Sequence, residues 1–114
     1  MVDNQVNPLE IKLLQKKRKL LIIFDNGQHY EFSCEYLRVF SPSAEVQGHG
    51  HRKWVKDKSH VNIIAIEPVG QYAVKLIFDD GHQTGIYSWD YLYQLGEKQT
   101  QNWLQYQEMI EMMQ

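Results

Sequence analysis

The sequence has little of what stabilises secreted proteins or anchors membrane proteins. Its 114 residues include one cysteine, Cys34, which excludes an internal disulfide framework and any Cys-x-x-Cys metal or redox motif. No run of about 18 apolar residues occurs, so no membrane-spanning helix is predicted. The polar start, Met1 to Gln5, lacks the apolar centre of a signal peptide. The cytoplasm is therefore the expected compartment.

A strong excess of positive charge is also lacking. The chain has 12 Lys and Arg residues against 14 Asp and Glu residues, which gives a net charge of -2. Non-specific binding to the phosphates of nucleic acids calls for a cationic surface. The one basic run, residues 16–19, is interpreted as a solvated turn between strands, with a phosphate-binding patch as the alternative. We therefore expect neither nucleic acid nor a membrane as a partner.

The short motifs that carry much catalytic chemistry are absent as well. The sequence contains no phosphate-cradling glycine loop, no His-Glu-x-x-His and no Gly-x-Ser-x-Gly. Cys34 stands among packing residues at a predicted helix start, and we interpret it as a small buried hydrophobe. We therefore do not expect an enzyme. A small enzyme that uses Cys34 or a histidine loop is the alternative.

The composition that is present belongs to a globular protein. Hydrophobic residues make up 43% of the chain and charged residues 23%, and the length corresponds to one ordinary domain. We predict a single domain over residues 1–114. Its core covers about residues 8–95, and a C-terminal helix follows at about residues 98–112.

Two parts of the chain repeat one pattern. A branched apolar run leads into an Asp-Asn-Gly turn at residues 25–27, and a second run leads into an Asp-Asp-Gly turn at residues 79–81. Glycine in these turns accepts a positive φ at little cost. A strand follows each turn and ends at Ser33 or Ser88, either of which can cap a short helix. The pattern predicts one strand–turn–strand–helix unit, used twice.

Two such units favour an α+β fold: a small, mostly antiparallel sheet with helices on one face. Strands are predicted at about residues 11–14, 20–24, 28–32, 62–69, 72–78 and 84–87. Helices are predicted at about residues 35–38, 89–95 and 98–112, and Gly96 is expected to end the second. The last helix has a Met-rich apolar face, which packs on the sheet or, alternatively, docks a partner.

A long segment without strand or helix signals, at residues 41–60, contains two closely spaced histidines besides His60. His49 and His51 are separated by one glycine, and His82 follows the second turn. Imidazole nitrogens suit zinc, iron, copper or nickel. The three histidines are therefore candidate ligands of one transition metal, zinc or iron above all. We interpret them in the first place as solvated histidines that bind nothing, with the metal site as the alternative, and no cofactor is certain from the sequence.

Three stretches, residues 37–46, 66–73 and 78–92, resemble the gamma-butyrobetaine hydroxylase-like N-terminal domain family, also named domain of unknown function 971. The last stretch reads Phe-Asp-Asp-Gly-His-Gln-Thr-Gly-Ile-Tyr-Ser-Trp-Asp-Tyr-Leu. The resemblance covers about residues 8–95. In oxygenase members this domain precedes a separate catalytic domain that holds iron, and related domains are fused to iron–sulfur cluster carrier ATPases. The resemblance thus implies an accessory role and a protein partner related to iron–sulfur proteins or oxygenases.

The resemblance also implies what has been lost. Zinc-binding members hold the metal with a Cys-Pro-Cys-x-x-Cys run and a later histidine. Here the three cysteine positions are Ser41, Ser43 and Val46, and the histidine position is His82. Serine hydroxyls stay protonated near neutral pH and are poor zinc ligands beside thiolates. We therefore expect the zinc site of the family to be degenerate in this chain.

Overall fold

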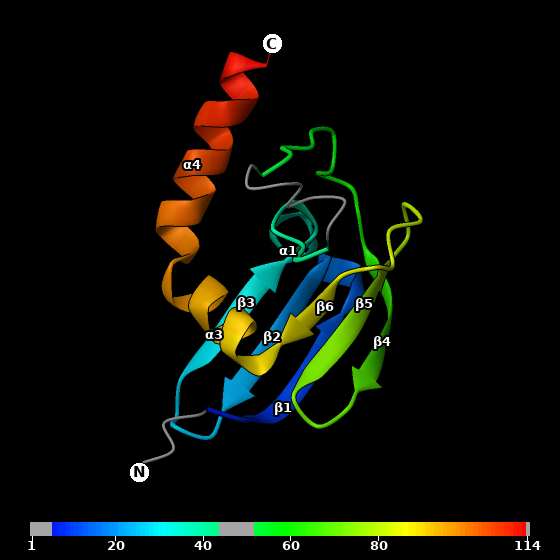
Figure 1. Cartoon of the computed structure of the whole chain (residues 1–114), viewed down its shortest axis with the longest axis vertical. Helices are drawn as coiled ribbons and strands as arrows, with labels where there is room; N and C mark the ends of the chain where they lie inside the picture. The colour runs from blue at the N-terminus through cyan, green and yellow to red at the C-terminus, as the bar shows by residue number, and fades with distance from the viewer. Residues whose placement is uncertain (1–5, 44–51, 114) are drawn as a thin grey trace.

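The computed structural model describes residues 6–43 and 52–113, and it confirms the α+β class and the C-terminal helix (Figure 1). His49 and His51 lie outside the described residues. The elements in chain order are β1 (Pro8–Leu14), the 3-10 turn η1 (Gln15–Lys17), β2 (Lys19–Phe24), β3 (His29–Ser33), α1 (Cys34–Val39), β4 (Ile63–Val69), β5 (Ala73–Phe78), β6 (Ile86–Ser88), α3 (Trp89–Glu97) and α4 (Gln99–Met112).

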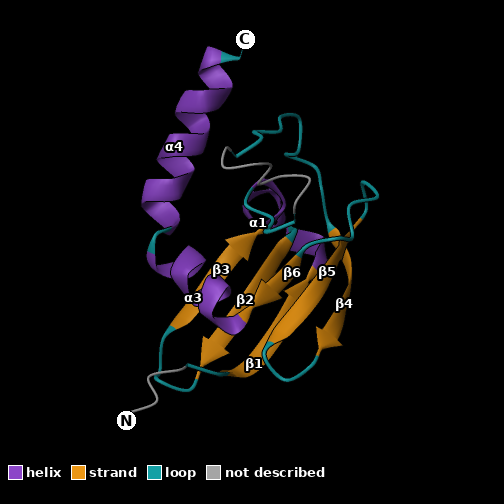
Figure 2. Ribbon diagram, viewed as in Figure 1, coloured by secondary structure: helices purple, strands orange, loops and turns teal. Residues whose placement is uncertain are grey.

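The strands belong to two antiparallel sheets, ordered β1-β2-β3 and β4-β5-β6 (Figure 2). One sheet was expected from the sequence, because alternation and turn signals identify strands but not the edges at which pairing stops. The two sheets meet where the Asn62 side-chain amide donates to the Gln15 carbonyl at 3.0 Å. The Gln15 amide in turn donates to the Ile63 carbonyl at 3.3 Å. These bonds connect the β1–β2 turn to the start of β4.

Both sheets carry the predicted strand–turn–strand–helix unit, and the helix starts are confirmed. The Ser33 hydroxyl accepts from the Tyr36 amide at 3.0 Å, and the Ser88 hydroxyl accepts from the Tyr91 amide at the same distance. Each serine thereby satisfies one of the amides that a helix start leaves without a partner. The start of α1 and the start of α3 thus follow directly from the sequence.

Gly96 does not end the second helix as predicted, because α3 continues to Glu97. A Cβ atom at Gly96 would collide with the Tyr30 ring of β3. The missing side chain therefore lets α3 approach the first sheet closely, and glycine serves packing here rather than helix termination.

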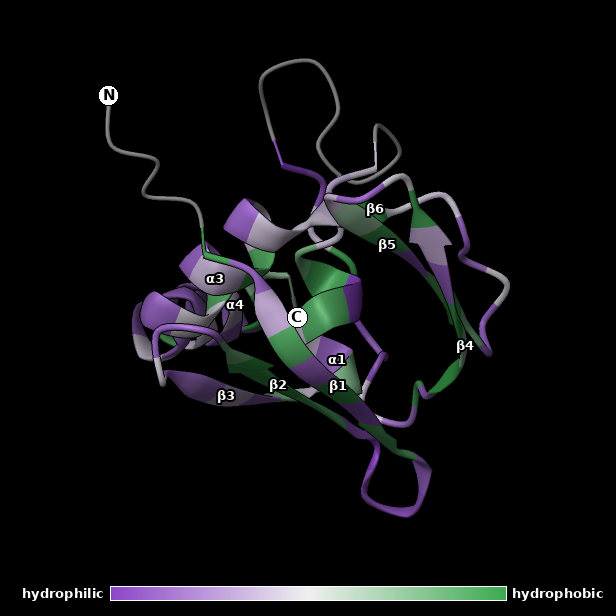
Figure 3. Cartoon of the chain, turned by 90° about the horizontal axis from the view of Figure 1, so that it is seen from below, coloured by the Kyte–Doolittle hydropathy of each residue, from purple (hydrophilic) through white to green (hydrophobic). Residues whose placement is uncertain are grey.

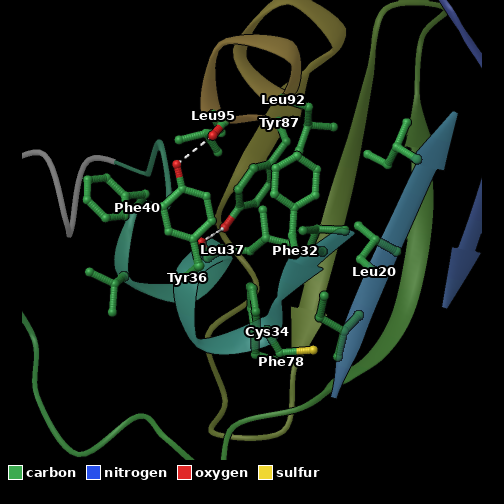
Figure 4. Close-up of a cluster of buried hydrophobic side chains, with 14 of the residues drawn as sticks. Leu20, Phe32, Cys34, Tyr36, Leu37, Phe40, Phe78, Tyr87, Leu92 and Leu95 are labelled. Atoms are coloured by element: carbon green, nitrogen blue, oxygen red, sulfur yellow. Dashed lines mark hydrogen bonds between the residues drawn. The ribbon is translucent and has the colours of Figure 1, made fainter. Parts of the chain in front are cut away.

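The core lies between the sheets. Figure 3 shows α1 between the two sheets, and the residues coloured as hydrophobic gather on α1, β2 and β5. Tyr36 and Tyr87 are fully buried within this apolar cluster, and each hydroxyl donates to a backbone carbonyl, that of Leu95 and that of Leu37 respectively (Figure 4). These two bonds attach α1 to α3 and to β6, and they satisfy polar groups that would be costly to bury unpaired.

The last helix, α4, is the least embedded element. Tyr106 is its one buried residue, while Trp103 and Ile110 are half-buried against the core. Its C-terminal end extends away from both sheets (Figure 1). No helix in the described ranges is long and apolar enough to cross a membrane.

Candidate functional site

The turn between β5 and β6 directs a histidine into the protein. Gly81 adopts a φ of +90°, and its amide donates to the Phe78 carbonyl at 3.3 Å. The carboxylate of Asp80 then accepts from the backbone amide of His82 at 3.1 Å, which is the usual Asx-turn bond. The result is that the His82 side chain is buried, with 6% of the residue exposed.

Two serines meet that histidine. The Ser41 hydroxyl oxygen lies 2.8 Å from Nε2 of His82, and the Ser43 hydroxyl oxygen lies 3.4 Å from the same atom. Both serines are buried, and the Ser43 amide also donates to the Ser41 hydroxyl at 3.3 Å. Ser41, Ser43 and His82 occupy three of the four ligand positions implied by the family resemblance. The structure therefore brings these three predicted residues together.

A glycine directly before β6 makes room for this cluster, and it was not identified as a site residue from the sequence. A Cβ atom at Gly85 would stand 2.5 Å from the Ser41 hydroxyl and 3.0 Å from the Tyr87 ring. Any side chain there would force Ser41 away from His82. The only sequence signal was glycine at a position where no turn required it.

Charges surround the other side of the turn. The Asp80 carboxylate lies 2.7 Å from Nε of Arg38 and 2.7 Å from Nζ of Lys58. Burial alone would raise the pKa of Asp80, but the hydrogen bonds from Lys58, Arg38 and the His82 amide outweigh it and lower the pKa to about 2. Asp80 therefore stays ionised near neutral pH and links α1, the 52–62 segment and the second turn.

The donor set of this cluster does not fit zinc. Two neutral hydroxyls stand where thiolates are needed, and Nε2 of His82 already takes part in the hydrogen bond with Ser41. In the described part of the chain, no three His, Cys, Asp or Glu side chains are arranged to hold a metal ion. The site formed by His49, His51 and His82 stays a prediction, because two of its members lie outside the described residues.

Cys34 is part of the core, as predicted. The residue is fully buried in the apolar cluster, and its thiol lies 3.6 Å from the Asn62 side-chain oxygen. Burial raises the pKa of the Cys34 thiol. A thiol kept protonated in this way is a weak nucleophile.

Two open grooves flank α4. The first has a volume of about 560 Å³ and the second about 460 Å³, and Trp103 lines both. The first is lined by Ser33, Tyr36, Gly96, Glu97, Gln99, Thr100, Trp103 and Leu104. The second is lined by Glu35, Asp57, Lys58, Ser59, Trp103, Tyr106, Gln107, Ile110 and Glu111. Both grooves therefore lie beside aromatic residues that contact the core.

The apolar face of α4 divides between packing and exposure. Trp103 and Tyr106 pack against each other and against core aromatics, with ring centroids 5.2 Å apart. In contrast, Leu104 is 55% exposed and Met112 is 78% exposed. The aromatic residues of α4 therefore pack on α1 and on Trp54 rather than on a sheet as predicted, while the methionine end of the helix remains on the surface.

Known proteins resemble this chain over most of its length. The family model described as gamma-butyrobetaine hydroxylase-like, N-terminal, matches residues 11–93. No curated protein matches the chain.

Three solved structures are similar to it. A protein solved by solution NMR is 51% identical, with a TM-score of 0.83, over 97% of this chain and 86% of that one. A second solution NMR structure is 41% identical, with a TM-score of 0.78, over 91% and 83%. A crystal structure from Acidithiobacillus ferrooxidans, of a protein with unknown function in the DUF971 family, is 39% identical, with a TM-score of 0.67, over 78% and 91%.

Proposed function

The chain belongs to the gamma-butyrobetaine hydroxylase-like N-terminal family, and we propose that it is a non-catalytic accessory module that binds a partner protein against α4. The proposal places it in the cytoplasm. An iron–sulfur or oxygenase-related protein is the partner class that the family resemblance favours. Metal handling would then belong to that partner rather than to residues of this chain.

The burial of its reactive side chains supports a role without catalysis. Cys34 and Ser41 have no exposed surface, and His82 is almost fully enclosed. Catalytic groups need a path to substrate and a pKa suited to their task. The Asp80 carboxylate accepts from the backbone amide of His82. The aspartate of a catalytic triad instead bonds the imidazole ring, so this contact does not orient the ring for catalysis.

The observation that carries the proposal is the pair of grooves on either side of Trp103. Both lie along α4, which is outside the 11–93 match of the family model. Tryptophan in a partly buried position between concave surfaces is a common anchor in protein interfaces. Leu104 beside it and the exposed methionines add apolar surface that can adapt to a partner.

Site-specific photo-crosslinking in cells tests the proposal. A photoreactive amino acid replaces Leu104 on α4 in one variant and Ile86 on β6 in the control, because both residues are about equally exposed. We expect one discrete adduct of defined mass from the Leu104 position and none from the Ile86 position. Equal labelling at both positions, or no adduct at Leu104, would contradict docking on α4.

A further inference from the structure

We propose that the second groove, between α4 and residues 57–59, binds an extended basic segment of the partner. This inference rests on the proposed function and names the chemistry of the docking segment. The groove combines an aromatic wall with a carboxylate rim, whereas its neighbour across Trp103 does not.

The wall of the groove is aromatic and held in place. Tyr106 is buried, and its ring lies over the Trp54 ring at a centroid distance of 6.1 Å and an interplanar angle of 27°. Trp103 lies beside Tyr106, and Ile110 continues the wall one turn further along α4. Aromatic faces attract cations, and they also cover the alkyl stems of Lys and Arg.

The rim of the groove is acidic. Glu35, Asp57 and Glu111 come from three different segments of the chain and line the same groove. Among the described residues, Lys58 is the one cation of the lining, and its ammonium lies 2.7 Å from the Asp80 carboxylate, which Arg38 also contacts. Even with the full charge of Lys58 counted, three carboxylates against one ammonium leave the described lining with an excess of negative charge.

The Tyr106 hydroxyl reports the field inside the groove. It donates to Oε2 of Glu35 at 3.2 Å. Burial, then Glu35, then Asp57 raise the pKa of Tyr106 to about 12. Burial is the largest cause of this shift, and the nearby carboxylates of Glu35 and Asp57 add to it by disfavouring the phenolate. Together with the three carboxylates of the lining, this gives the groove a negative potential that a cationic side chain would complement.

The spacing of the acids favours a peptide over a metal ion. Within the described residues no three acidic side chains are close enough to hold one ion, so the carboxylates are spread along the groove. An extended chain can place successive Arg or Lys residues against separate carboxylates. By comparison, Glu97 is the only charged residue of the first groove in the part of the chain that the structure describes, and charge therefore selects the second groove.

Titration of the labelled protein with two short peptides tests this inference. One peptide has arginine at alternate positions, and the matched peptide has citrulline, which keeps the shape and removes the charge. We expect the arginine peptide to shift the Trp103 and Tyr106 NMR signals, with an affinity that falls as salt is added. The citrulline peptide should leave these signals unchanged. Equal binding of both peptides would overturn the inference.

Charge variants locate the effect on the groove. Glu111→Lys should weaken binding of the arginine peptide by about tenfold or more, whereas Glu108→Lys, on the same helix but outside both groove linings, should not. Asp57→Asn removes a second groove carboxylate without changing the backbone, because Asn tolerates the positive φ of 63° at this position. Equal weakening by Glu108→Lys and Glu111→Lys would contradict a specific groove.

The two proposals can fail separately. If Leu104 still crosslinks to one partner while the arginine peptide does not bind, the basic-segment inference is wrong and the accessory role stands. If the peptide binds but Leu104 gives no adduct, the second groove recognises basic peptides, and docking of a partner across both grooves of α4 is contradicted.

Discussion

The two strand–turn–strand–helix units share one backbone plan and differ in what their turns do. Gly27 and Gly81 adopt φ values of +89° and +90°, and their amides donate to Phe24 and Phe78 respectively. The bonds that enter the turns correspond too, since Asp25 donates to the Asn7 carbonyl and Asp79 donates to the Asn62 carbonyl. The backbone is therefore repeated almost bond for bond.

The side chains of the two turns have different surroundings. Gln28 of the first turn is exposed, whereas His82 at the equivalent position is buried against Ser41. Asn26 bonds the Gln28 amide, while Asp80 bonds the His82 amide and also receives Arg38 and Lys58. The comparison shows that turn geometry alone does not decide the chemistry, because the segment packed against the turn does.

The largest difference in the free energy of unfolding is expected between variants at the fourth turn position, which is Gln28 in the first turn and His82 in the second. His82→Ala should lower the free energy of unfolding by about 3 kcal/mol, because it leaves the Ser41 and Ser43 hydroxyls buried without their shared partner. Gln28→Ala should change it by less than about 0.5 kcal/mol, since Gln28 is exposed. Urea unfolding of both variants measures the contrast. Equal losses would show that the two turns are not distinguished by burial.

The second contrast is in pH dependence. The pKa of Asp80 falls from 3.8 to about 2 on folding, so ionised Asp80 stabilises the fold above pH 4. That contribution, up to about 2 kcal/mol, is lost as the pH falls from about 4 to about 2.

Two substitutions that exchange the turn residues test this assignment. Asp80→Asn should flatten the stability profile between about pH 4 and pH 2, and Asn26→Asp should add no comparable slope. Asn26 is exposed and has no cation like Arg38 or Lys58 beside it in the described contacts. Unfolding at a series of pH values supplies the measurement, and an unchanged slope in Asp80→Asn would rule out Asp80 as its source.

A third pair of variants tests whether the two turns have equivalent backbones. Gly27→Ala and Gly81→Ala should each cost about 1 kcal/mol, because a side chain is strained at positive φ. A Cβ atom at either glycine would meet no heavy atom within 4 Å, so backbone strain is the only cost expected. Thermal unfolding should give equal losses, and a clear inequality would show that the two turns are not equivalent scaffolds.

The smallest effect on stability is expected from treatment with a metal chelator. Ser41, Ser43 and His82 form a hydrogen-bonded cluster in place of thiolate ligands, so a chelator should leave the unfolding midpoint unchanged. Titration of chelated protein with zinc and ferrous iron is the complementary measurement. Shifts of the His49, His51 and His82 ring signals would support the histidine metal site instead.

Local features of the fold could be predicted from the sequence. The Asp-x-Gly turns and the Ser33 and Ser88 caps are decided within a few residues, and both were predicted correctly. The meeting of Ser41 with His82 could be expected only from the family resemblance, because the two residues are 41 positions apart.

Long-range features could not be predicted. Division into two sheets depends on which strand edges stay unpaired. The role of Gly96 in α3 depends on the close approach of Tyr30, which lies on β3 of the first sheet. The same holds for the second groove, whose acids Glu35, Asp57 and Glu111 look unrelated in the sequence. Such features arise from tertiary packing, which no local pattern contains.

The central claim, binding at α4 rather than chemistry at the second turn, is tested most directly by NMR of the complex with the crosslinked partner. Met109, Met112 and Met113 all lie at the end of α4, and their methyl signals report that surface, while the His82 ring reports the second turn. The account predicts that partner binding shifts the methionine signals and leaves the His82 signal in place. A shifted His82 signal with unchanged methionines would contradict it.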